Sequence, residues 1–307
     1  MTETTETPAS GRDDGQDAGQ DAGRSERRQG RQGRSPRRRA VTVLLVVVAV
    51  LAATVGAAVV ADSLVAARVE KRISDRIFEE ANLATPPHVQ VTGTPYLAAV
   101  FTHEVPSIQV ESTDVEIPGF GRVTVSSSAT KITLGKDAVL SGDFTDAPAR
   151  EVFTRVQMDT VELGERMGID DLGLASQDNS SPTGGWETEG YLSGTPDGLS
   201  EEDSGRYEVG VRLRVWQGDV YLSPTEITDT PHSTAPEDLD DELTEQVLDA
   251  FTLEMPGENL PFRSPPRRVY TAGGTLFIEA EQNYTRVSVA DLAPSSGPLD
   301  EDEQAGL

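Results

Sequence analysis

The chain has 307 residues, with 26 Lys or Arg, 52 Asp or Glu, three His and no Cys. This length allows one large domain or two ordinary ones, and the apolar content is sufficient for a hydrophobic core. The absence of Cys excludes disulfides, Cys-ligated metal sites and a Cys nucleophile. The net charge of −26 argues against a nucleic-acid-binding protein, which needs a basic surface.

Residues 1–39 form a polar leader with nine Arg and seven acidic residues. The leader has no apolar periodicity, so burial cannot offset its chain entropy, and we expect a disordered tail. Eight of the Arg cluster between residues 24 and 39. The cluster indicates either a topology signal that keeps this end in the cytoplasm or a site for anionic lipid or nucleic acid.

Residues 40–61 contain no charged side chain. A helix of this length spans roughly 33 Å, enough to cross the hydrocarbon core of a bilayer. Together with the Arg cluster before it, this run predicts one uncleaved helix that crosses the cell membrane once. The N-terminus is then cytoplasmic, and residues 62–290 form an extracytoplasmic domain. A cleaved signal peptide is the alternative, although the apolar run is longer than a usual signal core.

An amphipathic helix is predicted for 64–81, because apolar residues recur every four positions at Val69, Ile73 and Ile77. It is expected to continue the transmembrane helix, with a break near residues 62–63. The stripe fits a helix that packs on a sheet and equally a helix that covers a lipid groove.

A short strand (88–92) and a short helix follow this first long helix. Thr94 is a candidate N-cap with Pro95 at the first helical position. The apolar face expected for this helix comprises Tyr96, Leu97, Val100 and Phe101.

Strands are predicted for 105–117 and 122–134, joined by a turn at 119–121, and a third for 138–144. In each of the first two, the apolar residues change from one parity to the other. A parity change requires a bulge or a bend, so we expect a strongly curved sheet.

A second amphipathic helix is predicted for 148–167, with Asp146 as its cap and Gly168 as its stop. Val152, Phe153 and Val156 are expected on its apolar face.

The rest of the chain predicts further strands and one more helix. Short strands are expected in 169–194 around a polar loop at 176–185, then strands at 207–215 and 220–228, and a third helix at 236–253. Closing strands are expected at 267–271, 275–281 and 284–290, followed by a disordered acidic tail at 291–307. The fold class is therefore α+β, with a curved antiparallel sheet, amphipathic helices and a single transmembrane helix in front.

No local motif predicts catalysis, a metal site or a cofactor. The three His lack metal-site spacing, and there is no nucleophile elbow or phosphate-binding loop. Acidic pairs such as Asp170–Asp171 are expected to be solvated charge. The acidity has one implication: anionic lipid headgroups repel this chain, so its contact with lipid has to be apolar and local.

Three segments resemble the LmeA-like phospholipid-binding family of actinobacteria. Val89–Leu97 (VQVTGTPYL) is similar to the family's V-x-G-x-P-F-L motif, and Val105–Val115 (VPSIQVESTDV) is similar to the segment that follows it. Asn259–Phe262 (NLPF) resembles the family's closing L-P-F segment, although Arg263 stands where Gly often follows. The resemblance covers about 64–290.

The resemblance implies a curved antiparallel sheet that wraps a long helix, similar to tubular lipid-binding domains. It implies a non-enzymatic protein that binds phospholipid acyl chains and serves cell-envelope lipid or lipoglycan maintenance. The candidate lipid-groove residues are Val69, Ile73, Ile77, Tyr96, Leu97, Phe101, Val152, Phe153 and Val156. An anchored envelope scaffold with a solid core is the alternative, and an envelope hydrolase is a third hypothesis.

Overall fold

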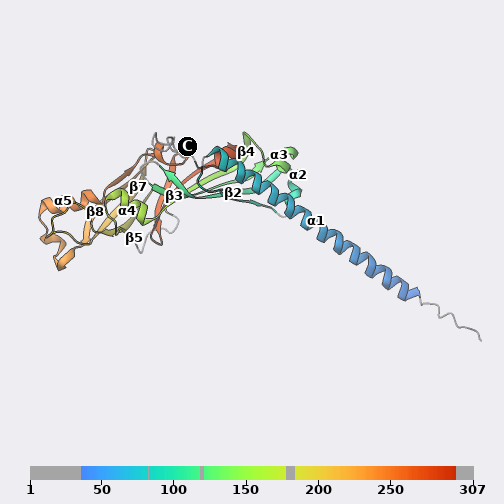
Figure 1. Cartoon of the computed structure of the whole chain (residues 1–307), viewed down its shortest axis with the longest axis horizontal. Coiled ribbons are helices and arrows are strands. Elements are labelled where there is room, and N and C mark those ends of the chain that lie inside the picture. Colours follow the sequence, from blue (N-terminus) through green and yellow to red (C-terminus); the bar gives the residue numbers. More distant parts are fainter. Residues whose placement is uncertain (1–35, 82, 94, 118–120, 178–183, 295–307) are drawn as a thin grey trace, which may run out of the picture. The chain divides into compact units, whose positions relative to one another are not determined.

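The computed structural model describes residues 36–81, 83–93, 95–117, 121–177 and 184–294 (Figure 1). Several predicted features lie outside these residues: most of the leader, the Thr94 cap, most of the 119–121 turn, the centre of the 176–185 loop and the tail beyond 294. The chain divides into two compact units, Met1–Ala53 and Thr54–Leu307. We call the second the folded unit.

One uninterrupted helix, α1 (Pro36–Glu80), runs from the first unit into the folded unit. In the described part of the chain it is the one helix long and apolar enough to cross a membrane, and its apolar window is fully unburied. This fits a membrane anchor. The break expected near residues 62–63 is wrong, because Asp62 stays helical while its carboxylate accepts hydrogen bonds from another segment.

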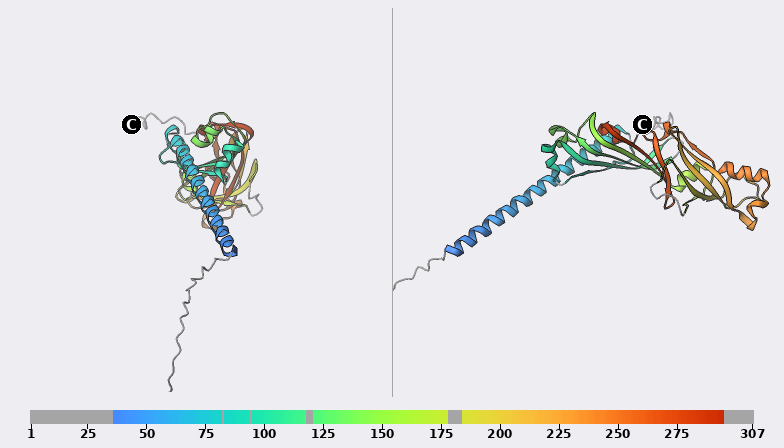
Figure 2. Two further views of the ribbon diagram at one scale, coloured as in Figure 1. Left: turned by 90° about the vertical axis from the view of Figure 1, so that its right-hand side faces the viewer. Right: turned by 180° about the vertical axis from the view of Figure 1, so that it is seen from behind.

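The folded unit contains two antiparallel sheets, which confirms the α+β class (Figure 2). The six-stranded sheet has the order β1 (His88–Thr92), β2 (Glu104–Ile117), β3 (Gly121–Thr133), β4 (Ala147–Met158), β11 (Thr275–Val287), β10 (Pro266–Ala272). The five-stranded sheet has the order β5 (Gly173–Ser176), β6 (Glu187–Gly194), β7 (Tyr207–Trp216), β8 (Asp219–Asp229), β9 (Leu253–Met255).

Short helices lie between these strands, and one follows the last strand. They are η1 (Tyr96–Ala98), α2 (Ala99–Thr102), α3 (Lys136–Ser141), α4 (Thr160–Met167), η2 (Pro231–Ser233), η3 (Pro236–Asp238), α5 (Asp241–Ala250), η4 (Gly257–Asn259) and η5 (Val289–Leu292).

The predicted parity changes are present in both long strands. The β2–β3 register shifts between Ser112 and Val115, where Asp114 has φ 55°. In β3 the buried positions change parity between Ala129 and Ile132, and Lys131 between them has φ 48°. Each irregularity turns the strand, so the same face of the sheet stays directed at the core.

That inner face packs against two different covers. In the helix-covered half, the α1 residues Val69, Ile73 and Ile77 pack with residues of β1–β4 such as Ile108 and Ala129. In the sheet-covered half, the five-stranded sheet, α4 and α5 pack with the other ends of β2–β4 and with β10 and β11. Leu83, just after α1, packs against both cores.

The helix predicted for 148–167 is wrong, because most of that range is the central strand β4. Val152 and Val156 satisfy a helical spacing and also the alternation of a strand, so the pattern alone cannot decide. Strand pairing decides between helix and strand, because β4 is hydrogen-bonded to β3 on one side and to β11 on the other. The helix α4 begins only after Asp159, whose side chain caps it, and Gly168 ends it as expected, with φ 70°.

Three other predictions need correction. The strand predicted at 138–144 is the helix α3, which buries Val139 under α1 and ends at Gly142 with φ 73°. The helix predicted for 236–253 is split into η3 and α5, and residues 253–255 pair with β8 instead. The separate strand at 284–290 is the second part of β11, and the tail starts later because Leu292 is buried in η5.

Candidate functional site

The predicted liners on α1 all face the six-stranded sheet. Val69, Ile73 and Ile77 are each at most 1% exposed, and they fill the space between the helix and the inner face of the sheet. Their spacing of four residues places them on one side of the helix. The stripe predicted on α1 is therefore confirmed as a buried face.

Polar contacts between α1 and the rest of the folded unit lie at the edges of this buried face. Val91 N–H donates to the Glu70 carboxylate at 2.9 Å, and Ser74 Oγ donates to the Pro87 carbonyl at 2.6 Å. On the other side, Arg76 forms an ion pair with Asp143. These few contacts tie the helix to its rim, while its centre contributes only apolar packing.

Asp62 connects the end of the apolar run to η1. Its carboxylate accepts the N–H of Tyr96 at 2.9 Å and the N–H of Leu97 at 2.7 Å, and the residue is only 7% exposed. Sequence reasoning did not identify this role. A lone acid directly after an uncharged run was the available signal, but its partners are 34 and 35 residues away.

Tyr96 and Ala99 are members of the core under α1 and also line a depression in the surface. The Tyr96 hydroxyl donates to the Val139 carbonyl, and burial, with a smaller contribution from Glu70, raises the pKa of Tyr96 to about 12. The depression has a volume of about 520 Å³, and we call it the base depression. It is lined by Gly93, Pro95, Tyr96, Ala98, Ala99, Thr102, Glu104 and Pro106.

Phe101 does not join this face, so the expectation of a shared apolar surface is wrong for it. Its side chain is 80% exposed, whereas Leu97 is half-buried. The helix α2 has only four residues and ends at His103, which has φ 59°. Ala99 takes the buried position of this turn, so Phe101 is directed away from the core.

The strand β4 separates the three candidates predicted on it. Val152 packs partly against the core of the helix-covered half, and Val156 lies fully buried in the core of the sheet-covered half. Phe153 has the opposite parity and lies on the outer face of the sheet. The structure therefore does not bring Phe153 together with the α1 residues.

Phe153 lines a polar trough on that outer face. The trough has a volume of about 290 Å³ and lies above Ser126 and Ser128, whose small side chains leave room between longer neighbours. Its described lining is His88, Gln90, Gln109, Val110, Glu111, Ser126, Ser127, Ser128, Phe153 and Arg155.

The charge beside the trough is internally balanced. Glu279 is 3% exposed and pairs with Arg155 at 2.7 Å and with Arg268 at 3.1 Å. Arg268 also pairs with Glu281 at 3.4 Å, so two carboxylates face two guanidinium groups. Tyr270 donates to the Glu279 carboxylate at 2.9 Å, and burial together with this bond raises the pKa of Tyr270. Sequence reasoning missed this network because its members come from three strands. A trough with neutralised charges suits polar groups better than a free anion.

The inner face carries a polar seam where the two cores meet. Ser127 Oγ lies 3.4 Å from Thr154 Oγ1, and the buried Ser112 Oγ has no hydrogen-bond partner among the residues that the structure describes. Leaving a buried hydroxyl unpaired costs about 1–3 kcal/mol. The seam therefore interrupts an otherwise apolar surface with hydroxyl groups that a bound polar atom can satisfy.

The described residues contain no group of three or more His, Cys, Asp or Glu that could hold a metal ion. They offer hydroxyls, an apolar interior and two surface hollows, which is an arrangement suited to binding.

A family model described as LmeA-like phospholipid-binding matches residues 60–281. No curated protein and no solved structure matches the chain. The matched range includes Asp62, the buried stripe of α1, the base depression and the trough, so it covers every feature described above.

Proposed function

Because the chain belongs to the LmeA-like phospholipid-binding family, we propose that it is a membrane-anchored, extracytoplasmic phospholipid-binding protein. It acts by binding and not by catalysis, in the maintenance of cell-envelope lipids or lipoglycans. Residues 40–61 anchor it in the cell membrane, with the Arg-rich leader in the cytoplasm.

The binding site in this proposal is the helix-covered half. Acyl chains lie between α1 and the inner face of the six-stranded sheet, where water is excluded. Val69, Ile73, Ile77 and Val152 line them. Because polar contacts fix α1 mainly at its edges, its apolar side chains can make room for a chain without the loss of buried hydrogen bonds.

The observation that carries this proposal is the position of the base depression. Tyr96 and Ala99 form part of its wall and also part of the core under α1, so the depression and the apolar interior share this wall. Asp62 places it directly beside the end of the apolar run. An acyl chain that leaves a membrane at that point therefore meets the shared wall of Tyr96 and Ala99 first, and we propose that it enters the interior there.

The experiment is native mass spectrometry of the full chain, purified in mild detergent from a lipid-containing host, with lipid extraction alongside. We expect phospholipid at a fixed stoichiometry. Ala98→Trp fills the base depression and should reduce the retained lipid several-fold. Its matched control is Thr244→Trp, which fills a depression of about 390 Å³ on α5 and should leave lipid retention unchanged.

Phe153→Asp separates the two candidate surfaces in the same assay. It alters the outer trough and leaves the interior intact, so lipid retention should not change. Equal loss of lipid from Ala98→Trp and Thr244→Trp, or a lipid-free chain that takes up none on incubation, would contradict the proposal.

A second candidate function is an anchored envelope scaffold. The observation that favours it is the full packing of Val69, Ile73 and Ile77, since a scaffold needs a solid core and no ligand. A stable, lipid-free chain that retains a protein partner after crosslinking would support this alternative.

A further inference from the structure

The base of the folded unit is the end at which Asp62 contacts η1, and it presents an exposed apolar surface. Phe101 on α2 is 80% exposed and Leu140 on the neighbouring helix α3 is 45% exposed. We call these two residues the base patch. Figure 1 shows α2 and α3 beside α1 at this end of the six-stranded sheet.

The base patch lies close to the end of the apolar run. The N–H groups of Tyr96 and Leu97 are 2.9 Å and 2.7 Å from the carboxylate of Asp62, the first residue after that run. Phe101 follows Leu97 by four residues, which is about 6 Å along a helix. The headgroup zone of a bilayer is roughly 5–8 Å deep on each side, so the patch falls within its reach.

Charge does not oppose contact at this end. The base segments 62–72, 96–106 and 130–143 hold five Lys or Arg and five Asp or Glu, including all three Lys of the chain. Arg68, Lys131 and Lys136 form no ion pair with any described residue. The base is therefore neutral overall in a chain of net charge −26.

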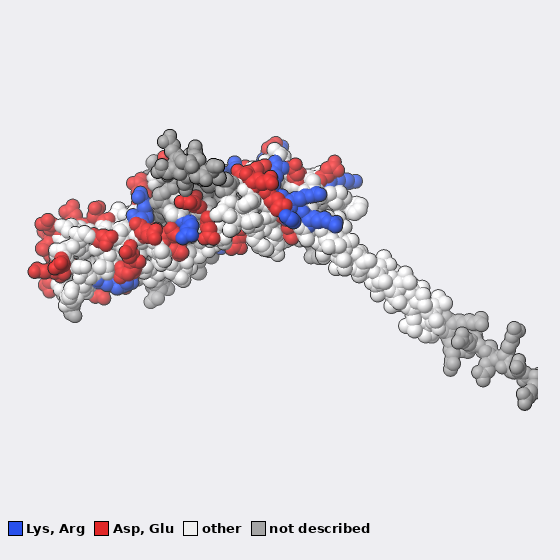
Figure 3. Space-filling model, in the orientation of Figure 1, with Lys and Arg blue, Asp and Glu red and all other residues white. Residues whose placement is uncertain are grey.

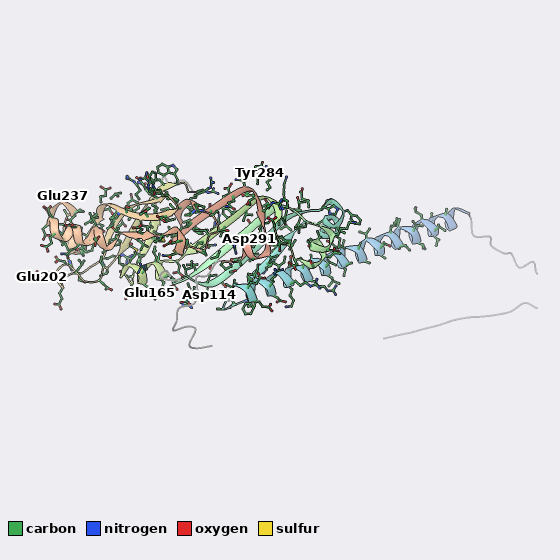
Figure 4. The ribbon with its side chains drawn as sticks, turned by 90° about the horizontal axis from the view of Figure 1, so that it is seen from above. Asp114, Glu165, Glu202, Glu237, Tyr284 and Asp291 are labelled. Carbon is green, nitrogen blue, oxygen red and sulfur yellow. The ribbon has the colours of Figure 1, made fainter. Side chains whose placement is uncertain are left out.

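The opposite end of the folded unit is strongly acidic. Residues 237–250, which include α5, hold seven acidic residues and no Lys or Arg. Figure 3 shows many red side chains at this end, and red and blue ones side by side where α1 meets the sheet. Figure 4 places Glu202 and Glu237 at the acidic end. Anionic headgroups repel the acidic end and not the base.

We propose that the base patch docks on the bilayer that residues 40–61 span, with Phe101 and Leu140 in the boundary between headgroups and acyl chains. The inference rests on the proposed membrane anchor and not on lipid binding in the interior. Burial of one Phe and one Leu supplies the attraction, and the neutral base removes the electrostatic cost. Docking keeps the base depression against the lipid surface.

The test uses the full chain in nanodiscs. Because the chain has no Cys, one introduced Cys gives a single labelling site. A single Thr102→Cys, next to Phe101, carries a fluorophore, and spin-labelled headgroups quench it. The matched control is Val161→Cys on α4, an apolar position of 60% exposure in the sheet-covered half. We expect quenching at 102 at least three times that at 161, and equal in low and high salt.

Tethering by α1 alone also brings residue 102 near the membrane, so a second variant is needed. Phe101→Ser in the labelled chain should lower quenching at 102 at least two-fold, because an exposed side chain contributes little to the fold. Quenching that Phe101→Ser leaves unchanged, or that high salt abolishes, would overturn the inference. A chain that does not incorporate into nanodiscs would also overturn the inference, because the proposed membrane anchor would then be absent. Lipid retention in the mass spectrometry assay does not depend on docking of the base patch, so the two proposals can fail separately.

Discussion

The inner face of the six-stranded sheet is covered by α1 in one half and by the five-stranded sheet in the other. These two covers differ in how firmly they are bound to the rest of the folded unit. In the sheet-covered half, β5 to β9 form a hydrogen-bonded sheet whose residues share a core with β10, β11 and α5. In the helix-covered half, the cover is a single helix, held by a few polar contacts at its rim and by the Asp62 carboxylate at its start. A helix can move as one body, whereas opening the other half means separating a whole sheet. The difference favours the helix-covered half as the place where a ligand can enter.

The largest expected effects come from removing one large buried side chain in each half. Phe251 in the sheet-covered half and Ile73 in the helix-covered half are both at most 1% exposed. Phe251→Ala should lower the free energy of unfolding by about 3–5 kcal/mol, and Ile73→Ala by about 2–5 kcal/mol. Denaturant titration of the full chain in detergent micelles measures both.

Added phospholipid should change the stability of these two variants to different extents. Ile73→Ala leaves space along the proposed acyl path, so lipid should restore part of its stability, as ligands do that bind only the folded state. Phe251→Ala should gain no more from lipid than the parent chain. Equal recovery in both variants would remove the functional difference between the two halves.

Each half also contains a buried tyrosine that makes it sensitive to alkali. Burial raises the pKa of Tyr96 to about 12, and burial also raises the pKa of Tyr207. The unfolded chain ionises at a pKa of about 10. The contribution of Tyr96 is therefore complete below pH 10 and is lost as the pH rises toward 12, to a total of up to about 3 kcal/mol.

Two Phe variants assign this loss to one half. The unfolding free energy is expected to fall with rising pH between about pH 9 and 12, the range set by the unfolded and folded pKa values of Tyr96. Tyr96→Phe should reduce this fall more than Tyr207→Phe does. Both variants lose one hydrogen bond to a backbone carbonyl, so they are matched in that respect. A steeper alkaline fall in Tyr96→Phe than in the parent chain would contradict the assignment.

The sequence predicts local patterns better than long-range pairing. The Val69, Ile73 and Ile77 stripe and the parity changes near Asp114 and Lys131 are local patterns, and the structure confirms them. Residues 148–158 are different, because a central strand depends on partners 20 to more than 100 residues away. No local pattern contains that information.

The candidate site shows the same limit. Helical spacing correctly groups the α1 residues, but the wrong helix over 148–167 placed Phe153 with Val152 on one face. The Glu279 network and the contacts of Asp62 join residues from distant segments, so only the folded chain shows them. Phe101 was expected inside because it is apolar, and its exposure depends on where the short helix α2 ends.

The smallest expected effect tests whether α1 is seated independently of the rest. Gly142 and Gly273 both have left-handed backbone, with φ 73° and 59°, so Ala at either position pays a similar conformational cost of about 1–2 kcal/mol. At Gly142 a Cβ would lie 3.0 Å from Val69 Cγ1, whereas at Gly273 nothing lies within 4 Å.

A Cβ at Gly142 meets α1 and a Cβ at Gly273 meets nothing, so the difference between the two substitutions reports how easily the helix yields. Gly142→Ala should be more destabilising than Gly273→Ala by about 1 kcal/mol or more, and hydrogen exchange should accelerate at residues 62–80 alone. If the two variants are equally stable and α1 exchange is unchanged, the helix shifts at no cost and the rim contacts do not fix it. If exchange also accelerates throughout β5 to β9, the two halves unfold together. That result would refute the claim that α1 can move independently of the sheet-covered half.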